Sequence, residues 1–282
     1  MKQSLLGIIG HHISYTLSPA LHNEAIRVLG LPYTYGVFDV SGEMLPGLLE
    51  AMRREHVRGA NVTKPHKEAV MPLLDELSGE ATALGAVNTI VNTDGVLRGE
   101  NTDVDGVRAS LVPHAAMLSN EPLLVLGAGG ASRAALYAAA EFRPCTIMIH
   151  NRNTERARQT AAIFAALFPD VRFDVVEAAN LVQAASQARL IVNTTTVGMT
   201  PDTDAMPLPN ETRFSNHQII FDIVYTPLQT ALLRKAAADG AAVINGMDMF
   251  IHQGARAFTL WTGEKFPVQA PRERVLRELG MR

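Results

Sequence analysis

The sequence predicts an α/β fold built from an N-terminal α/β lobe and a Rossmann-type doubly wound domain, with C-terminal helices that return to the first lobe. Three observations lead to this prediction. Short runs of β-forming residues alternate with helical patterns along the chain, as in parallel sheets covered by helices. A glycine cluster at residues 127–130 separates an apolar run from an Ala-rich helical stretch. The chain has 282 residues, which is enough for two domains of ordinary size.

The first part of the chain predicts three strands and two helices, followed by a hairpin. The strands are expected at residues 5–9, 33–38 and 58–62, and the helices at residues 19–29 and 43–55. Ser18-Pro19 predicts an N-cap followed by the proline that suits the first helical position. The Asp94-Gly95 step predicts a tight turn between strands at residues 88–92 and 95–98.

The second part alternates strands and helices more regularly, which favours a doubly wound sheet. Strands are expected at residues 123–126, 146–150, 171–176, 190–193, 219–222 and 241–245, and helices at residues 131–142, 154–168 and 227–238. The boundary between the two parts is expected near residue 106. The final segment has helical patterns at residues 247–261 and 272–279 and no strand of its own, so we expect it to pack on the first lobe.

Composition and charge argue against several classes of protein. Hydrophobic residues make up 47% of the chain and charged residues 19%, which is typical of a globular protein with a sizeable core. The net charge is −3, so neither nucleic acid nor a membrane is an expected partner. Polar residues follow the apolar run at residues 5–9 too soon for a signal peptide. The single cysteine, Cys145, and the lack of zinc-site spacing predict a cytoplasmic protein without a metal.

The glycine cluster has the spacing of a dinucleotide-binding turn. Gly127 would permit the tight turn, Gly129 would let the backbone approach the pyrophosphate, and the following helix would offer unpaired N–H groups. A helix-entry turn without a ligand is the alternative, but the strand before it and the helix after it favour the cofactor site. A P-loop is excluded because the required Lys-Ser/Thr is absent. The candidate cofactor contacts are Gly127, Ala128, Gly129, Gly130, Ala131 and Ser132.

The loop after the next predicted strand favours NADP over NAD. No carboxylate stands at the end of that strand, where NAD-specific enzymes place one for the ribose hydroxyls. Arg152 and Arg156 are four residues apart at a helix start, so both guanidinium groups, with Asn151 beside them, could bind a 2′-phosphate. Glu155 lies between them, and ordinary surface charge is the alternative interpretation. NAD therefore remains a second possibility.

Uncharged hydrogen-bonding side chains gather at predicted strand ends and helix starts of the first lobe. They occur at residues 16–18, 61–67, 85–89 and 99–103. Asn and Thr side chains both donate and accept hydrogen bonds, so they suit a polyhydroxylated small molecule. Ser18 at a helix N-terminus, with Thr16 nearby, would bind a carboxylate through two hydroxyls and the helix dipole.

Six segments, in order along the whole chain, resemble the shikimate dehydrogenases and their quinate dehydrogenase relatives. They are Asn61-Val62-Thr63-x-Pro65-x-Lys67, Gly85-Ala86-Val87-Asn88-Thr89, Asn101-Thr102-Asp103-x-x-Gly106, the glycine cluster from Gly127 to Ala131, Asn193-Thr194-Thr195 before Gly198-Met199, and Gly246 through Gln253. The resemblance implies NADP-linked interconversion of 3-dehydroshikimate and shikimate. It implies a substrate-binding catalytic lobe at residues 1–106, an NADP-binding Rossmann domain at residues 107–245, and C-terminal helices at residues 246–282 that pack on the first lobe.

The same resemblance assigns roles to individual residues. Lys67 and Asp103 would form the catalytic pair, because reduction of a ketone needs a proton donor as alkoxide charge develops and a carboxylate would hold the lysine in place. Taken singly, Lys67 could be a solvated lysine and Asp103 a helix cap. The remaining matching positions imply substrate contacts at Thr63, Asn88, Tyr225 and Gln253, and a cofactor lining of Thr195, Ile223 and Gly246.

The first loop departs from the family pattern, which usually reads Gly-Asn-Pro-x-x-His-Ser-x-Ser-Pro. Residues 10–19 read Gly-His-His-Ile-Ser-Tyr-Thr-Leu-Ser-Pro, so Thr16 replaces the first serine of the pair. This leaves open a paralogue that acts on quinate or a related hydroxy acid, and residues 258–263 also resemble the quinate/shikimate branch. A non-catalytic metabolite sensor is a third reading. The protein is expected to be a monomer or a homodimer.

Overall fold

The computed structural model describes residues 4–281, which form two compact units. The first unit takes in the chain up to Thr102 and again from Ile251, and the second is Asp103–Phe250. The chain thus changes unit at the start of α5 (Asp103–Leu111) and inside α10 (Met247–Thr262), whereas the sequence suggested residues 106 and 245. A boundary within or beside a helix leaves no break in the helical pattern, which explains the offset. Within residues 4–281 no helix is long and apolar enough to cross a membrane.

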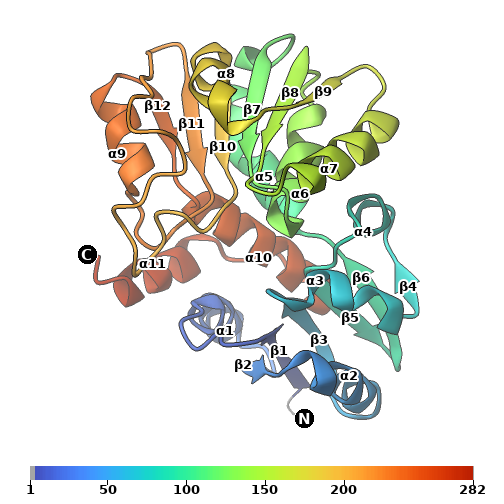
Figure 1. Ribbon diagram of the computed structural model, residues 1–282. Coiled ribbons are helices and arrows are strands. Elements are labelled where there is room, and N and C mark those ends of the chain that lie inside the picture. The colour runs from blue at the N-terminus through green and yellow to red at the C-terminus, as the bar shows by residue number, and fades with distance from the viewer. Residues whose placement is uncertain (1–3, 282) are drawn as a thin grey trace. The chain divides into compact units, whose positions relative to one another are not determined.

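The first unit contains a mixed six-stranded sheet in the order β2-β1-β3-β5-β6-β4 (Figure 1). Its strands are β1 (Ser4–Gly10), β2 (Tyr33–Asp39), β3 (Val57–Val62), β4 (Glu76–Leu77), β5 (Thr89–Thr93) and β6 (Val96–Glu100). β1 pairs parallel to β2 and β3, and β5 runs antiparallel to β3 and β6. The predicted hairpin is confirmed, since Asp94 and Gly95 both have positive φ, 53° and 92°. β4 was not predicted, because two residues carry no alternation pattern.

The helices and helical turns of the first unit alternate with these strands before the chain enters the second unit. They are α1 (Ser18–Leu29), the 3-10 turn η1 (Gly42–Met44), α2 (Leu45–Arg54), α3 (His66–Ala69), the 3-10 turn η2 (Met71–Leu73) and α4 (Gly79–Leu84). The predicted Ser18 cap is wrong, because Ser18 is already the first helical residue and Leu17 takes the cap position without a side-chain bond. The Ser18 hydroxyl instead accepts a hydrogen bond from Thr16 Oγ1 at 3.2 Å.

The C-terminal helices return to the first unit, as the sequence predicted. Trp261 of α10 is fully buried, and its indole N–H donates to the Ile90 carbonyl of β5 at 2.9 Å. α11 (Gln269–Glu278) packs along α1. A separate apolar cluster, which includes Leu49 of α2, Val62 of β3 and Ile90, forms the core between the sheet and α2.

The second unit is a doubly wound parallel sheet in the order β12-β11-β10-β7-β8-β9, whose strands lie side by side in Figure 1. The strands are β7 (Pro122–Leu126), β8 (Thr146–His150), β9 (Arg172–Val175), β10 (Leu190–Asn193), β11 (Ile219–Asp222) and β12 (Ala242–Ile244). Read from β9, this is the Rossmann order 3-2-1-4-5-6. The chain reverses direction across the sheet between β7 and β10, so a ligand site is expected at the carboxyl ends of these two strands.

The helical elements of the second unit include the three predicted helices, together with elements that the sequence did not predict. They are α5, η3 (Val112–Met117), α6 (Gly130–Ala140), α7 (Thr154–Leu167), η4 (Ala178–Asn180), α8 (Leu181–Gln187) and α9 (Ala231–Ala238), with the first turns of α10. α9 starts four residues later than the proline at position 227 suggested, because Thr230 caps it by accepting a hydrogen bond from Leu233 N–H at 3.3 Å. α5 and the short helix α8 were not predicted.

Candidate active site

The glycine turn between β7 and α6 has the geometry that the sequence predicted for a dinucleotide site. Gly127 has φ +116°, and a Cβ there would lie 2.4 Å from Thr194 Oγ1, so only glycine fits. At Gly129 a Cβ would meet no heavy atom within 4 Å, which leaves this backbone open to a ligand. Ser132 occupies the third fingerprint position, and its buried hydroxyl donates to the Gly127 carbonyl at 2.7 Å. The serine therefore holds the turn closed.

Ala128, Gly130 and Ala131 complete this turn and open the helix. Ala128 is 1% exposed, so its side chain belongs to the core and only its backbone can serve a ligand. Gly130 begins α6, with Gly129 at the cap position and no side-chain cap bond. The first N–H groups of α6 therefore have no capping side chain, which is the arrangement that binds a pyrophosphate.

The loop after β8 presents two arginines to solvent. Arg152 and Arg156 are exposed, and Asn153 caps α7 by accepting from Arg156 N–H at 3.0 Å. Asn151 Nδ2 donates to the Asn153 carbonyl at 2.9 Å, which fixes the loop. Glu155 lies 3.7 Å from Arg158 in an ion pair. This carboxylate therefore has a basic partner other than the two candidate arginines.

Three further candidate cofactor residues lie at the carboxyl ends of β10 to β12. Thr195 follows β10, and its hydroxyl and N–H both donate to Asn193 Oδ1, at 2.8 and 3.1 Å. Ile223 follows β11, and Gly246 lies against it, since a Cβ on Gly246 would be 2.0 Å from the Ile223 carbonyl oxygen. Gly246 N–H donates to the Val224 carbonyl at 3.1 Å. These contacts bring the three residues to the edge that also carries the glycine turn.

In the first unit, the candidate substrate residues gather at one edge of the mixed sheet. β1 and β3 end together, because Ile9 pairs with Val62, and β5 begins beside them at Thr89. Thr63 follows β3, is half-buried, and donates its N–H to the Ile9 carbonyl at 2.8 Å. Asn88 precedes β5, and its carbonyl accepts from Val62 N–H at 2.7 Å. The topology alone therefore places Thr63 and Asn88 side by side.

A continuous chain of buried hydrogen bonds runs along this edge. The Tyr35 hydroxyl donates to Asn61 Oδ1 at 2.7 Å, and Asn61 Nδ2 donates to Thr89 Oγ1 at 3.1 Å. Asn88 Oδ1 accepts two of these bonds, from Thr89 Oγ1 at 3.0 Å and from Thr102 N–H at 2.7 Å. Each amide orientation is thus fixed by its neighbours. Tyr35 was missed in the sequence because it lies mid-strand in β2, away from any polar motif.

Tyr35 also connects this chain to the start of α1. Burial raises the pKa of Tyr35 well above its ordinary value, while a hydrogen bond with Ser18 opposes the shift. The His22 ring stacks on Tyr35 with centroids 4.3 Å apart. Ser18 is 5% exposed, and Thr16 is half-buried next to it. α1 therefore packs against the same network as Asn88 through the His22–Tyr35 stack, and the two hydroxyls proposed for a carboxylate lie at the start of this helix.

Lys67 and Gln253 also belong to the first unit, whereas Asp103 and Tyr225 belong to the second. Lys67 is half-buried in α3, and its carbonyl accepts from Val87 N–H at 2.8 Å, next to Asn88 in the chain. Gln253 is half-buried in α10. Asp103 is 6% exposed and begins α5. The Tyr225 ring stacks on Phe250, with centroids 4.6 Å apart.

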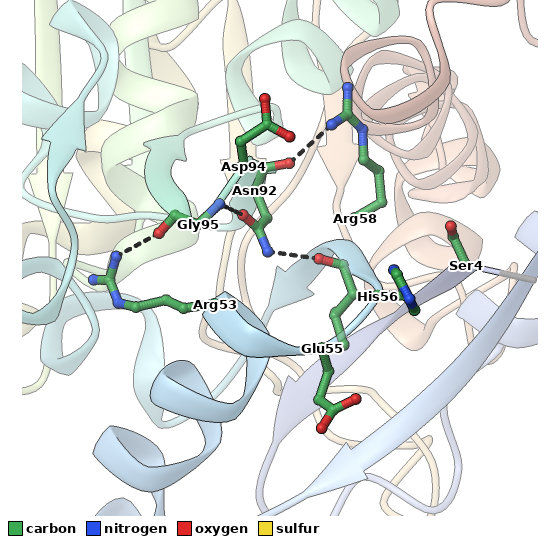
Figure 2. Close-up of a pocket in the computed structure, with 9 residues that line it drawn as sticks. Ser4, Arg53, Glu55, His56, Arg58, Asn92, Asp94 and Gly95 are labelled. Atoms are coloured by element: carbon green, nitrogen blue, oxygen red, sulfur yellow. Dashed lines mark hydrogen bonds between the residues drawn. The ribbon is translucent and has the colours of Figure 1, made fainter. Parts of the chain in front are cut away.

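A cavity of about 290 Å³ lies at the opposite end of β1 and β3, around the hairpin turn (Figure 2). Two arginines line it, but their donors already serve backbone carbonyls: Arg53 Nη1 donates to Gly95 at 2.9 Å and Arg58 Nη1 to Asn92 at 3.2 Å. Parallel sheets bind ligands at the carboxyl ends of their strands. This cavity is therefore not the candidate site. Among residues 4–281, no group of three His, Cys, Asp or Glu side chains is placed to hold a metal.

Comparison with known proteins indicates one family over nearly the whole chain. Residues 8–90 match the shikimate dehydrogenase substrate binding domain, and residues 246–276 match the shikimate 5′-dehydrogenase C-terminal domain. The shikimate dehydrogenase (NADP(+)) of Salinibacter ruber is 40% identical over 94% of each chain. Shikimate 5-dehydrogenase from Thermus thermophilus, solved with NADP(H) and shikimate, has a TM-score of 0.85 and 39% identity, covering 97% of this chain and 99% of that one.

A quinate dehydrogenase is also structurally similar. The enzyme from Corynebacterium glutamicum, solved with NAD, has a TM-score of 0.91 and 32% identity, covering 98% of this chain and all of the other. The two NADP-linked shikimate enzymes are more similar in sequence, as their identities of 40% and 39% show. On this full-length similarity, the chain belongs to the shikimate dehydrogenase family.

Proposed function

We propose that this protein is an NADP-dependent shikimate dehydrogenase that interconverts 3-dehydroshikimate and shikimate. The observation that carries the proposal is the 40% identity to a shikimate dehydrogenase (NADP(+)) over 94% of the chain. Two features of the structure agree with it. The first unit presents a polar edge of amide and hydroxyl groups, and the second a Rossmann sheet with an open glycine turn.

The first unit would act as the substrate lobe. Ser18 and Thr16 would bind the carboxylate at the start of α1, where the helix dipole favours an anion. Thr63 and Asn88 lie together at the sheet edge and would hydrogen-bond the ring hydroxyls. Tyr225 and Gln253 would complete the substrate contacts, as matching positions of the family motifs.

The second unit would act as the NADP domain, and its residues fit that cofactor. The Gly127–Ser132 turn and the start of α6 would hold the pyrophosphate, since nothing obstructs the backbone at Gly129. Arg152 and Arg156 would bind the 2′-phosphate, and β8 ends in His150 rather than a carboxylate that would repel it. When bound, NADPH supplies the hydride that adds to the substrate carbonyl carbon.

Lys67 and Asp103 would handle the proton. In the reducing direction the Lys67 ammonium donates a proton to the carbonyl oxygen as negative charge develops there, and in the reverse direction the neutral amine removes it from the hydroxyl. Asp103 would hold the lysine in place and stabilise its positive charge. A lysine and a carboxylate that share this task act as a unit, so loss of either should cost much of the rate.

The alternatives raised by the sequence are less well supported. The quinate alternative rested on the altered first loop and on residues 258–263, but the Corynebacterium quinate dehydrogenase is less similar in sequence, at 32% identity, than the shikimate enzyme of Salinibacter, at 40%. Loss of Lys67 or Asp103 would favour a non-catalytic metabolite sensor, and both residues are present.

Mass spectrometry of the product tests the proposal most simply. The purified protein is incubated with shikimate and NADP⁺, and the organic product is compared with authentic 3-dehydroshikimate. The expected product has lost two hydrogens from shikimate, with one NADPH formed for each molecule oxidised. Formation of no dehydrogenated product under conditions in which the protein is folded and binds NADPH would refute the proposal.

A further inference from the structure

Two buried polar side chains, Asn193 and Asp222, join the carboxyl ends of β10 and β11. Both are 0% exposed, and Asn193 Nδ2 donates to Asp222 Oδ1 at 2.9 Å. Neither residue carries an assigned role in binding or proton transfer. A buried amide and a buried carboxylate are costly to desolvate unless their hydrogen bonds are satisfied, so their partners indicate what they hold.

Asn193 shapes the loop that follows β10. Its Oδ1 accepts two hydrogen bonds from Thr195, from the N–H at 3.1 Å and from the hydroxyl at 2.8 Å. The hydroxyl oxygen of Thr195, Oγ1, in turn accepts a hydrogen bond from Val197 N–H at 3.2 Å. One amide side chain therefore fixes both the backbone and the side chain of Thr195, the proposed cofactor-lining residue.

Asp222 does the same for the loop that follows β11. Its Oδ1, which already accepts from Asn193, also accepts from Val224 N–H at 3.1 Å. The Val224 carbonyl accepts from Gly246 N–H at 3.1 Å, which brings the end of β12 onto this loop. Oδ1 of Asp222 thus connects the proposed cofactor-lining segments that follow β10, β11 and β12.

The other carboxylate oxygen serves the scaffold instead. Asp222 Oδ2 accepts from the Thr230 hydroxyl at 2.7 Å, and Thr230 caps α9. The two oxygens therefore separate two tasks: Oδ1 faces the loops of the site, and Oδ2 anchors the start of a helix. This separation makes the two tasks testable one at a time.

The position of the pair in the sheet indicates which part of the cofactor it affects. In a doubly wound fold a dinucleotide lies across the switch point, with one nucleotide on each half of the sheet. The glycine turn and the two arginines belong to the β7–β8–β9 half, which would bind the 2′-phosphorylated adenosine. β10, β11 and β12 form the other half, so the loops that Asn193 and Asp222 hold would face the nicotinamide nucleotide.

We propose that Asn193 and Asp222 are a positioning pair for the nicotinamide half of NADP, which they orient by holding Thr195 and the segment from Ile223 to Val224 in place. They act through these loops and not by contact with the cofactor. The inference rests on the proposed NADP-linked function and deepens it by separating the binding of the two nucleotide halves.

The test compares the binding of NADPH with that of adenosine 2′,5′-bisphosphate, which lacks the nicotinamide nucleotide, by calorimetry on the full chain. Asn193→Ala is expected to weaken NADPH binding by about tenfold or more and to leave the bisphosphate affinity within about twofold. Asn193→Ser is the milder second variant, used if the alanine variant does not fold. A larger primary isotope effect with deuterated NADPH is expected in either, because the nicotinamide is less well oriented for hydride transfer.

Thr230→Val is the matched control, because it removes the bond to Oδ2 and the α9 cap but leaves Oδ1 and both loops. It should lower Tm and keep NADPH affinity within about twofold of the native protein. Unchanged NADPH binding in a folded Asn193 variant, or an equal loss of bisphosphate binding, would overturn the inference. If the native protein bound neither probe, the proposed cofactor itself would be wrong, which is a distinct result.

Discussion

Ser18 is proposed to bind the substrate carboxylate, and its surroundings bear on that role. Ser18 is 5% exposed, and its hydroxyl oxygen accepts a hydrogen bond from Thr16 Oγ1 at 3.2 Å, which holds the hydroxyl in place. A hydroxyl fixed in this way is preorganised to donate to a carboxylate. The sequence identified Ser18 as a helix cap, which is wrong, but its expected place next to Thr16 is confirmed.

Replacement of Ser18 by alanine should therefore raise KM for shikimate. The loss of one hydrogen bond to a charged group, about 1.5 kcal/mol, predicts an increase of roughly tenfold, with a smaller change in kcat. Steady-state kinetics with shikimate as the varied substrate measures it. Ser14→Ala, an exposed serine in the same loop, should leave KM unchanged. An unaltered KM in Ser18→Ala would place the carboxylate elsewhere.

Lys67 is the residue proposed to move the proton. Lys67→Ala should lower kcat by roughly two to four orders of magnitude, the usual range for a general acid–base group, with a smaller effect on KM. Lys64→Ala is the control, because Lys64 is near enough to Lys67 for their charges to interact; burial, followed by the charge of Lys67, lowers the pKa of Lys64. The control should keep kcat within about threefold. A near-native kcat in Lys67→Ala would show that Lys67 is not the residue that transfers the proton.

At the scale of elements, the sequence predicted most of the secondary structure that positions the site. The glycine turn, the hairpin and the strand ends were visible, because each depends on local residue types such as Asp94-Gly95. Short elements such as β4 and α8 were not visible, because they contain too few residues to show a period. The hairpin of β5 and β6 could be predicted from its turn, but the antiparallel pairing of β5 with β3 could not, because it depends on the order of strands in the sheet.

The loop between β8 and α7 carries the two arginines that we propose to select NADP⁺ over NAD⁺. Arg152→Ala should weaken NADP⁺ binding by about 10- to 150-fold, the loss of charge-assisted bonds worth ~1.5–3 kcal/mol, and should scarcely change NAD⁺ binding. Arg158→Ala is the control on the same helix, because Arg158 pairs with Glu155 and Glu177. Calorimetric titration with each nucleotide measures the ratio. Equal losses for both nucleotides would show that Arg152 does not read the 2′-phosphate.

At the scale of the whole molecule, buried polar groups are what the sequence could not reveal. Tyr35, Asn193 and Asp222 lie in or at the ends of apolar strands, and their hydrogen-bond partners come from strands far away in the chain. Strand order decides these partners, and no local pattern encodes it. Motifs therefore suggest the candidate contacts, whose roles stay predictions, but they do not reveal the hydrogen-bond network around them.

His22 couples the first unit's stability to pH. It is fully buried among aromatic rings, and burial lowers its pKa from 6.5 to about 3. The folded state thus keeps His22 neutral while the unfolded chain takes up a proton below pH 6.5. The free energy of unfolding should fall as pH drops from 6.5 to about 3, by an amount on the order of 5 kcal/mol from this residue.

His22→Phe should reduce the fall in the free energy of unfolding between pH 6.5 and about 3, as measured by urea unfolding across this pH range. Asp222→Asn is the control of opposite sign, because burial raises the pKa of Asp222 from 3.8 to about 6. The folded state binds a proton on Asp222 more tightly than the unfolded chain, so Asp222 increases the free energy of unfolding as pH falls from about 6 to 3.8. Asp222→Asn removes this contribution, so the free energy of unfolding should fall more steeply with decreasing pH. An acid loss of native size in His22→Phe would contradict the assignment.

We expect shikimate and NADP⁺ to be the preferred substrate and cofactor of this protein. Measurement of kcat/KM for four pairs checks this: shikimate or quinate, each with NADP⁺ or NAD⁺. We expect the highest kcat/KM for shikimate with NADP⁺, because β8 ends without a carboxylate and the relatives of 40% and 39% identity are named shikimate dehydrogenase (NADP(+)). A higher value for quinate, or for NAD⁺ with either substrate, would contradict it.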